Sequence, residues 1–439
     1  MLKELFNNKG FLKYLKNTSW LLSEKILRLF VGVFIGAWVA RYLGPDKYGL
    51  LSYSLSFVGL FSVLATFGLD NILVRELVKD KEKEGVLLGT SLLLKLIGSI
   101  IVILLLSCAI NFVSDEASTN TLVLIIGSAT VFQSFNVVDL YFQSKTMSRY
   151  VVYVNIIALL ISSLLKIFFI SINAPLIYFA FIILFDNFIV ALGFIYFFLS
   201  FYSKDKSLKL FLNYFKFDIN VAISLLKDSW PLMFSGLLIS IYMKIDKIMI
   251  KEFLGNQAVG EYSVAALLSE LWYFIPLMIV SSLYPAIVNA KKISNELYLK
   301  RLQNLYDLMV WLAILIAFPV MFMSDYIIDL LYGQEFSNAA ATLTIHIWTG
   351  VFVFLGVAFG SFLNTENYNK KYLFKSFIGA LTNITLNYYL IPVYGISGAA
   401  MATLIGQFTS NYLTDFLDKD LHQQLLMKSK SFFPIHLIK

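Results

Sequence analysis

The chain has 439 residues, of which 59% are hydrophobic and only 14% are charged, and its mean hydropathy is +0.75. Soluble globular proteins carry roughly 25% charged residues, so this composition excludes a soluble protein and predicts an all-α polytopic membrane protein. A net charge of +7 would suggest a nucleic-acid partner in a soluble protein, but in a membrane protein its meaning depends on which loops carry it.

Residues 1–18 mix apolar and basic side chains and predict an amphipathic segment at the cytoplasmic surface of the membrane. We expect no cleavable signal peptide, because the apolar run that follows is a full span without an A-x-A site. About twelve runs reach the roughly 20 residues that a membrane-spanning helix needs. They lie near 19–43, 49–72, 86–111, 120–143, 150–171, 176–200, 224–254, 258–288, 302–323, 338–363, 372–391 and 396–416.

Lysine and arginine are unevenly distributed between the two sets of loops. With the N-terminus in the cytoplasm, about 26 of the 35 Lys and Arg residues fall in cytoplasmic segments, which satisfies the positive-inside rule and places both termini there. The basic stretch 201–227 predicts a cytoplasmic linker. It separates a six-helix lobe at 19–200 from a second six-helix lobe at 228–417, which a cytoplasmic tail follows at 418–439.

An internal repeat relates the two lobes. The stretch Ser19–Tyr53 recurs in altered form at Ser229–Val264, and in each copy a Ser-Trp pair opens an apolar run that ends in Leu-Gly and a short polar turn. Because each lobe has an even number of spans, both copies enter the membrane in the same orientation. The lobes are therefore parallel repeats related by a pseudo-two-fold axis, and the substrate path is expected in a central cavity at their seam.

The first copy of the repeat carries a stripe of charged and small residues at intervals of four. It consists of Glu24, Arg28, Gly32, Gly36 and Ala40. Glu24 and Arg28 have the favourable order for an ion pair, and the glycines allow another helix to approach closely. Helix packing is one interpretation of the stripe. The other interpretation is a functional site. A charge at the centre of the bilayer costs roughly 2.5–3.5 kcal/mol, so a charged residue within a span usually serves a function.

Depth separates the remaining charged residues of the spans. Lysines near a membrane surface can extend to the headgroups; they are Lys25, Lys166, Lys244 and Lys247. Deeper or shorter side chains must pair or line a water-filled cavity; they are Arg28, Lys95, Asp139, Asp186, Asp246, Glu270 and His346. We expect Arg28 and Asp246 to matter most, because they lie in the repeated element.

Uncharged polar residues form faces on three spans and indicate a wet interior, with interhelical hydrogen bonding as the alternative for any single residue. The faces are Gln133, Asn136, Asp139 and Gln143; Gly379, Asn383 and Asn387; and Thr403, Gln407, Ser410 and Asn411. Enzyme motifs are absent, since the three histidines are scattered and no GxSxG, Walker loop or CxxC occurs. The single cysteine, Cys108, excludes an intrachain disulfide and is expected to serve packing alone.

Five segments together resemble the Wzx-like polysaccharide flippases of the multidrug/oligosaccharidyl-lipid/polysaccharide exporter superfamily. They are RYLGPDKYG at Arg41–Gly49, FGLDNILVRE at Phe67–Glu76, IDKIMI at Ile245–Ile250, LYGQEF at Leu331–Phe336 and NITLNYYLIPVYGISGAAMA at Asn383–Ala402. Their order, the twelve spans and the duplication extend the resemblance over the whole chain.

The resemblance implies a V-shaped pair of six-helix bundles around a cationic cavity. It further implies transport of undecaprenyl-pyrophosphate-linked oligosaccharide repeat units to the outer leaflet of a bacterial cytoplasmic membrane, for O-antigen or capsule synthesis. Pyrophosphate is best held by arginine or lysine, and sugars by amide and aromatic side chains. The candidate substrate contacts are Arg28, Lys95, Lys244, Asn136, Asn383 and Asn387. The candidates for ion pairs or for carrying a coupling ion, H+ or Na+, are Glu24, Asp139, Asp246 and Glu270.

We expect a monomer in contact with membrane lipids, without a cofactor, a resident metal or a nucleic-acid partner; association with a polysaccharide polymerase is left open. Two rival functions share the fold. A multidrug exporter favours an anionic cavity, and a lipid II flippase commonly has two further spans. A membrane glycan polymerase or ligase would need a large outer loop for catalysis, and the loops here are short.

Overall fold

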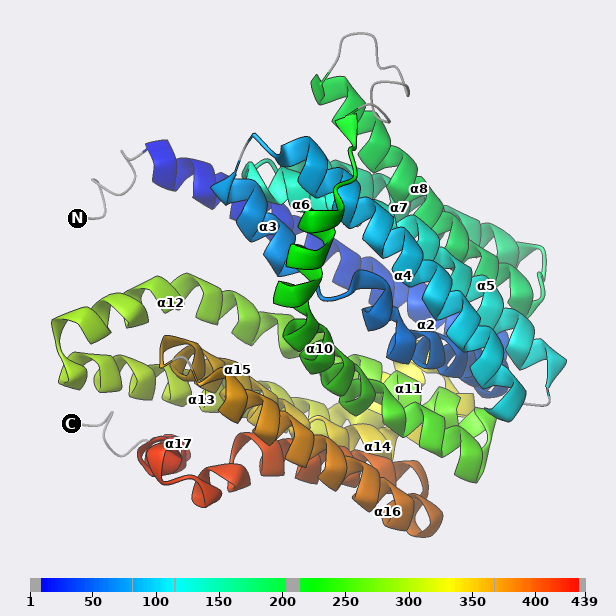
Figure 1. Cartoon of the computed structure of the whole chain (residues 1–439). Helices are drawn as coiled ribbons and strands as arrows, with labels where there is room; N and C mark the ends of the chain where they lie inside the picture. Colours follow the sequence, from blue (N-terminus) through cyan, green and yellow to red (C-terminus); the bar gives the residue numbers. More distant parts are fainter. Residues whose placement is uncertain (1–8, 81, 114–115, 203–213, 367, 434–439) are drawn as a thin grey trace. The chain divides into compact units, whose positions relative to one another are not determined.

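The computed structural model describes residues 9–80, 82–113, 116–202, 214–366 and 368–433. Within these ranges every regular element is a helix and no strand occurs, which confirms the predicted all-α class (Figure 1). The chain separates into two compact units. Unit 1 comprises Met1–Tyr42 and Ser54–Ser240, and unit 2 comprises Leu43–Tyr53 and Ile241–Lys439.

The helices follow the apolar runs of the sequence. From the N-terminus they are α2 (Lys9–Thr66), α3 (Asp70–Lys79), α4 (Glu84–Val113), α5 (Ala117–Gln133), η1 (Ser134–Asn136), α6 (Val137–Ser144), α7 (Arg149–Ser171) and α8 (Leu176–Tyr202). They continue with α10 (Ile219–Leu254), α11 (Asn256–Glu270), η2 (Leu271–Tyr273), α12 (Phe274–Ile293), α13 (Asn295–Tyr332), η3 (Gln334–Phe336), α14 (Ala339–His346) and α15 (Thr349–Thr365). The last are α16 (Asn369–Asn411), η4 (Leu413–Leu417), η5 (Lys419–Leu421) and α17 (His422–Ser431).

Two of the long helices contain a sharp bend at a glycine. Gly44 (φ 72°) interrupts α2 and Gly395 (φ 61°) interrupts α16, both in the left-handed region that glycine alone adopts without strain. Each bend falls between two predicted spans. Over the described residues, nine helical segments are long and apolar enough to cross a membrane, with α2 and α16 each counted once. Many membrane-spanning helices are thus confirmed, while the count of twelve stays a prediction.

The repeated Leu-Gly turns pack on each other within unit 2. A β-carbon at Gly49 would lie 1.8 Å from the carbonyl oxygen of Asn256, and one at Gly260 would lie 2.1 Å from that of Pro45. Only glycine permits this reciprocal approach of two backbones. The contact explains why Leu43–Tyr53 belongs to unit 2 although it lies in the first copy of the repeat.

The boundary between the units lies inside α10, after Ser240, and so beyond the predicted linker at 201–227. Residues 203–213 of that linker, and residues 1–8 of the predicted amphipathic segment, lie outside the described part of the chain. The described end of the linker packs on unit 1, where Lys216 N donates to Gly85 O at 3.1 Å. Asp218 then caps α10, because its Oδ1 accepts from the backbone N–H groups of Asn220 (2.8 Å) and Val221 (3.1 Å).

Unit 1 buries an apolar core that the first turns of α10 complete through Ala222 and Leu225. Outside this core, a β-carbon at Gly32 or Gly36 would meet no described atom within 4 Å, so no helix backbone packs on that stripe within the unit. Cys108 on α4 is exposed, which corrects the expectation that it serves packing. Leu104 and Leu105 of the same apolar run are exposed as well.

Unit 2 is built on α13, α15 and α16, with α13 and α15 side by side (Figure 1). The predicted tail contains a helix, α17, that packs on this unit. Tyr306 OH donates to Gln424 Oε1 at 2.7 Å, and Gln303 Nε2 donates to the carbonyl oxygen of Met427 at 3.0 Å. These bonds hold α17 against α13.

Candidate functional site

The second half of α10, with α11 and α16 of unit 2, surrounds a buried carboxylate. Asp246 is 4% exposed, within the apolar IDKIMI segment. Its Oδ2 accepts hydrogen bonds from Tyr262 OH and from Thr403 Oγ1, both at 2.6 Å, and its Oδ1 accepts one from Asn387 Nδ2, also at 2.6 Å. These three donors on two other helices compensate for the hydration that the carboxylate loses on burial.

The bend in α16 brings the other members of this cluster together. Asn383 and Asn387 lie one turn apart before Gly395, and Thr403 lies after it. Asn387 Nδ2 also donates to Asn383 Oδ1 at 3.2 Å, and Asn383 Nδ2 donates to Thr403 Oγ1 at 3.4 Å. The two limbs of α16 therefore meet at the carboxylate. We call Asp246, Tyr262, Asn383, Asn387 and Thr403 the Asp246 cluster.

One oxygen of the cluster, Asn387 Oδ1, is buried and accepts no hydrogen bond from any residue that the structure describes. Buried amide oxygens are nearly always paired. Over the described residues, no three His, Cys, Asp or Glu side chains gather as a metal-binding group. The cluster offers instead one carboxylate together with amide and hydroxyl oxygens, which is a donor set for a hard cation rather than a transition metal.

A second polar contact lies against the cluster. The Tyr262 ring meets the His346 ring edge to face, with centroids 5.8 Å apart, and His346 Nδ1 lies 2.8 Å from Ser269 Oγ. His346 is 1% exposed. Glu270, the next residue after Ser269, ends α11 in a half-buried position. This arrangement links α11 to α14 directly behind the carboxylate.

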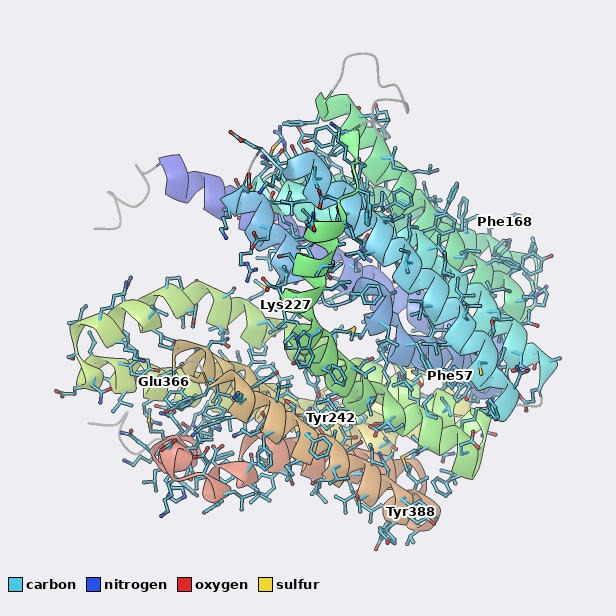
Figure 2. The ribbon with its side chains drawn as sticks, viewed as in Figure 1. Phe57, Phe168, Lys227, Tyr242, Glu366 and Tyr388 are labelled. Atoms are coloured by element: carbon cyan, nitrogen blue, oxygen red, sulfur yellow. The ribbon has the colours of Figure 1, made fainter. Side chains whose placement is uncertain are left out.

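The remaining charged candidates of unit 2 lie on α10. Lys244 and Lys247 are half-buried and flank Asp246 in the sequence. Tyr242, labelled in Figure 2, lies on the same helix and precedes Asp246 by one helical turn in the sequence, and its buried hydroxyl makes no hydrogen bond with any described residue. Unit 2 thus concentrates polar side chains along the segment of α10 that carries Asp246.

Unit 1 holds the other predicted residues in separate contacts. Arg28 forms an ion pair with Glu24 at 2.8 Å, and the Arg28 side chain is 48% exposed. Lys95 is buried and pairs with Asp70, with Nζ 2.6 Å from Oδ1. Asp139 Oδ1 accepts a hydrogen bond from Gln143 at 3.0 Å. Asn136 lies in η1.

The structure therefore brings together Asp246, Asn383 and Asn387, and leaves Arg28 and Lys95 in ion pairs of their own. The sequence did not indicate the partners Tyr262 and Asp70. Tyr262 follows the repeated Leu-Gly turn and Asp70 lies in the FGLDN segment, so position in a motif was their only signal.

Two family models match the chain. One, described as polysaccharide biosynthesis protein, matches residues 14–291, and another, described as MatE, matches residues 231–389. A relative of nearly full length is an uncharacterized membrane protein of Methanocaldococcus jannaschii, 24% identical over 95% of this chain and 86% of its own length.

Other relatives match over shorter stretches. The capsular polysaccharide biosynthesis protein CapF of Staphylococcus aureus is 23% identical over 41% of this chain and 46% of its own. The probable flippase AglR of Haloferax volcanii is 27% identical over 39% of this chain and 37% of its own. The match to these two relatives thus spans less than half of their length.

Solved structures share the fold at low sequence identity. An inward-facing multidrug resistance MATE family transporter of the MOP superfamily aligns with a TM-score of 0.76 and 16% identity, over 92% of this chain and 95% of its own. The lipid II flippase MurJ, in an inward closed conformation, aligns with a TM-score of 0.66 and 17% identity, over 97% and 93%.

Proposed function

Because this chain belongs to the polysaccharide biosynthesis protein family, we propose that it moves a polyprenyl-pyrophosphate-linked oligosaccharide between the leaflets of a membrane. It is a multi-pass membrane protein with the fold of the MOP superfamily transporters. The names of the relatives support a flippase in polysaccharide synthesis. The finer proposal is an undecaprenyl carrier, an O-antigen or capsule product, and a bacterial cytoplasmic membrane with both chain termini in the cytoplasm.

The Asp246 cluster is the structural observation that carries this proposal. A charged side chain among apolar helices is costly and marks ion pathways or coupling sites in membrane proteins. Asp246 is held by donors from α11 and from both limbs of α16, so a change in its charge alters contacts among three helices at once. Such a site suits a transporter that changes conformation, and we propose that Asp246 carries the coupling ion.

Sodium fits the donor set better than a proton. The carboxylate, the amide oxygens of Asn383 and Asn387 and the hydroxyl of Thr403 provide oxygen ligands from two helices. Among the described residues, Asn387 Oδ1 has no hydrogen-bond partner. Hard cations are bound by oxygen ligands of this kind. A bound Na+ would replace hydrogen bonds to Asp246 and thereby favour one arrangement of α10 and α16 over another.

Arg28 is the proposed contact of the pyrophosphate. Its guanidinium is half-exposed and its Nε and Nη2 atoms share Glu24, so it has donors left for a planar, bidentate contact with a phosphate. Lys244 and the amides of Asn136, Asn383 and Asn387 remain proposed substrate contacts. Lys95 is a weaker one, because it is buried and its charge is already paired with Asp70.

Drug export is the second candidate, since the MatE model matches residues 231–389. The experiment that separates the two uses proteoliposomes with three substrates side by side: a fluorescent polyprenyl-pyrophosphate-linked oligosaccharide, lipid II and ethidium. The proposal predicts that only the lipid-linked oligosaccharide reaches the opposite leaflet faster than in protein-free vesicles. Transport of ethidium alone would establish an exporter of drugs.

A further inference from the structure

A cavity of about 340 Å³ lies in unit 2 between the start of α16 and the η4–η5 segment, and no member of the Asp246 cluster lines it. Four lysines line it, namely Lys370, Lys371, Lys375 and Lys419. Phe374 and Leu417 supply apolar walls. The cavity is thus basic and apolar at the same time.

Ion pairs satisfy only part of its positive charge. Lys371 pairs with Asp418 at 2.7 Å and with Asp420 at 2.6 Å. Lys375 and Lys428 share the single carboxylate of Asp415, both lysines being fully or almost fully buried. Lys370 and Lys419 make no ion pair with any residue that the structure describes. Five lysines thus face three aspartates.

The helix α17 contributes the fifth lysine, Lys428, which is fixed by several contacts. Lys428 donates to Asp415 Oδ2 at 2.7 Å and to the carbonyl oxygen of Asn411 at 2.8 Å, and its Nζ lies 3.3 Å from the centre of the Phe359 ring. Burial and repulsion from Lys375 lower the pKa of Lys428 to about 7, although Asp415 opposes both effects. Even without Lys428, four lysines meet three aspartates here.

Both walls of the cavity change from exposed apolar side chains to lysine. On α16, Lys370 precedes Phe374, Phe377 and Leu381 on one helical face, and these three are 54%, 49% and 51% exposed. On the other wall, Phe416 and Leu417 are exposed and Lys419 follows them. In a membrane protein, exposed apolar side chains contact acyl chains, so the lysines lie at the level of the lipid headgroups.

From these observations we infer that the cavity binds the phosphate of an anionic phospholipid, between Lys370 and Lys419, with an acyl chain against Phe374 and Leu417. The headgroup supplies the negative charge that the three aspartates do not. Basic pockets between helices at the cytoplasmic side of a membrane bind acidic lipid headgroups by the same chemistry. The cavity lies at the start of α16 and beside the tail at 418–439, both of which are predicted to be on the cytoplasmic side.

The test uses the full-length protein in neutral detergent and counts bound lipid by native mass spectrometry. Phosphatidylglycerol, phosphatidylcholine and inorganic phosphate are titrated separately, so that a lipid and a soluble anion are distinguished. The variant is Lys370→Gln with Lys419→Gln, both exposed in the free protein. The matched control is Lys292→Gln with Lys300→Gln, two exposed lysines of the same unit that do not line the cavity.

Each lysine at a membrane surface strengthens binding of anionic lipid roughly five-fold, so the double variant should weaken phosphatidylglycerol binding by about 25-fold. The control variant should match the wild type, and phosphatidylcholine should bind weakly to all three proteins. Equal loss in the control would mean a diffuse surface charge and would overturn the inference. So would equal binding of the two lipids, or saturation by inorganic phosphate at concentrations that exclude the lipid.

Discussion

Alanine at Gly49 or Gly260 should destabilise unit 2. An added β-carbon would lie 1.8 Å from the backbone oxygen of Asn256 in the first case and 2.1 Å from that of Pro45 in the second, whereas ordinary contacts are 3.4 to 4 Å. Both neighbours are backbone atoms, which cannot rotate away. The two turns must therefore separate by more than about 1 Å, and overpacking of this kind typically costs about 1–3 kcal/mol.

The free-energy cost of the clash exceeds the gain in helix propensity from replacing glycine with alanine. Alanine in place of glycine stabilises a helix by about 0.5–1 kcal/mol, and both residues lie in helical segments. Gly32→Ala and Gly36→Ala are the matched controls, because an added β-carbon there meets no described atom within 4 Å. We expect the controls to be as stable as the wild type or slightly more stable.

Thermal unfolding of the purified protein in detergent measures the difference. With about 2 kcal/mol lost in a unit of roughly 200 residues, the melting temperature should fall by about 4–8 °C for Gly49→Ala and for Gly260→Ala. The double variant should lose less than the sum, since the first substitution already separates the turns. Unchanged melting temperatures in both single variants would refute the close packing of the repeated turns.

Three further predictions concern transport and topology. Arg28→Ala should abolish transport of the lipid-linked glycan at normal protein levels, and Arg28→Lys should keep part of it because the charge remains without the bidentate donors; wild-type transport in the alanine variant would leave Arg28 only a packing role. Cysteines at positions Asp46 and Gln257, in a cysteine-free background, should crosslink through a short reagent and block transport until cleavage, if the turns separate during alternating access; full activity while crosslinked would exclude that separation. Alkaline phosphatase fused after Asn120 should be active and fused after Lys291 inactive, and the opposite pattern would invert the predicted topology.

The helices could be predicted well from the sequence, because the length of each apolar run determines whether it forms a membrane-spanning helix. Runs of about 20 apolar residues have few alternatives to a spanning helix. The bends at Gly44 and Gly395 lie between two predicted spans, because glycine readily adopts the positive φ that such a bend requires. The repeated turn showed which segments are equivalent. It did not show that the turns pack together, because that contact depends on the tertiary structure.

The side-chain partners could be predicted only in part. Asn383 and Asn387 were predicted to share one polar face, and Asp246 was singled out in the repeated element; the structure shows that the three form one cluster. Tyr262 was missed because tyrosine is common in apolar segments and its hydroxyl reaches Asp246 from another helix. The helix α17 was missed because its buried face contains Gln424 and Lys428, residue types that are usually exposed.

We propose that Asp246 couples an ion gradient to movement of a lipid-linked glycan. The direct measurement is the flipping rate of a fluorescent polyprenyl-pyrophosphate oligosaccharide in proteoliposomes, with and without a Na+ gradient, at constant pH. The wild type and the control Asp325→Asn, an exposed acid of the same unit, should flip the substrate faster when the gradient is present. Asp246→Asn should show the same slow rate in both conditions, because the amide keeps the size but not the charge of the site. Gradient-dependent flipping at the wild-type rate in Asp246→Asn would exclude Asp246 as the coupling site.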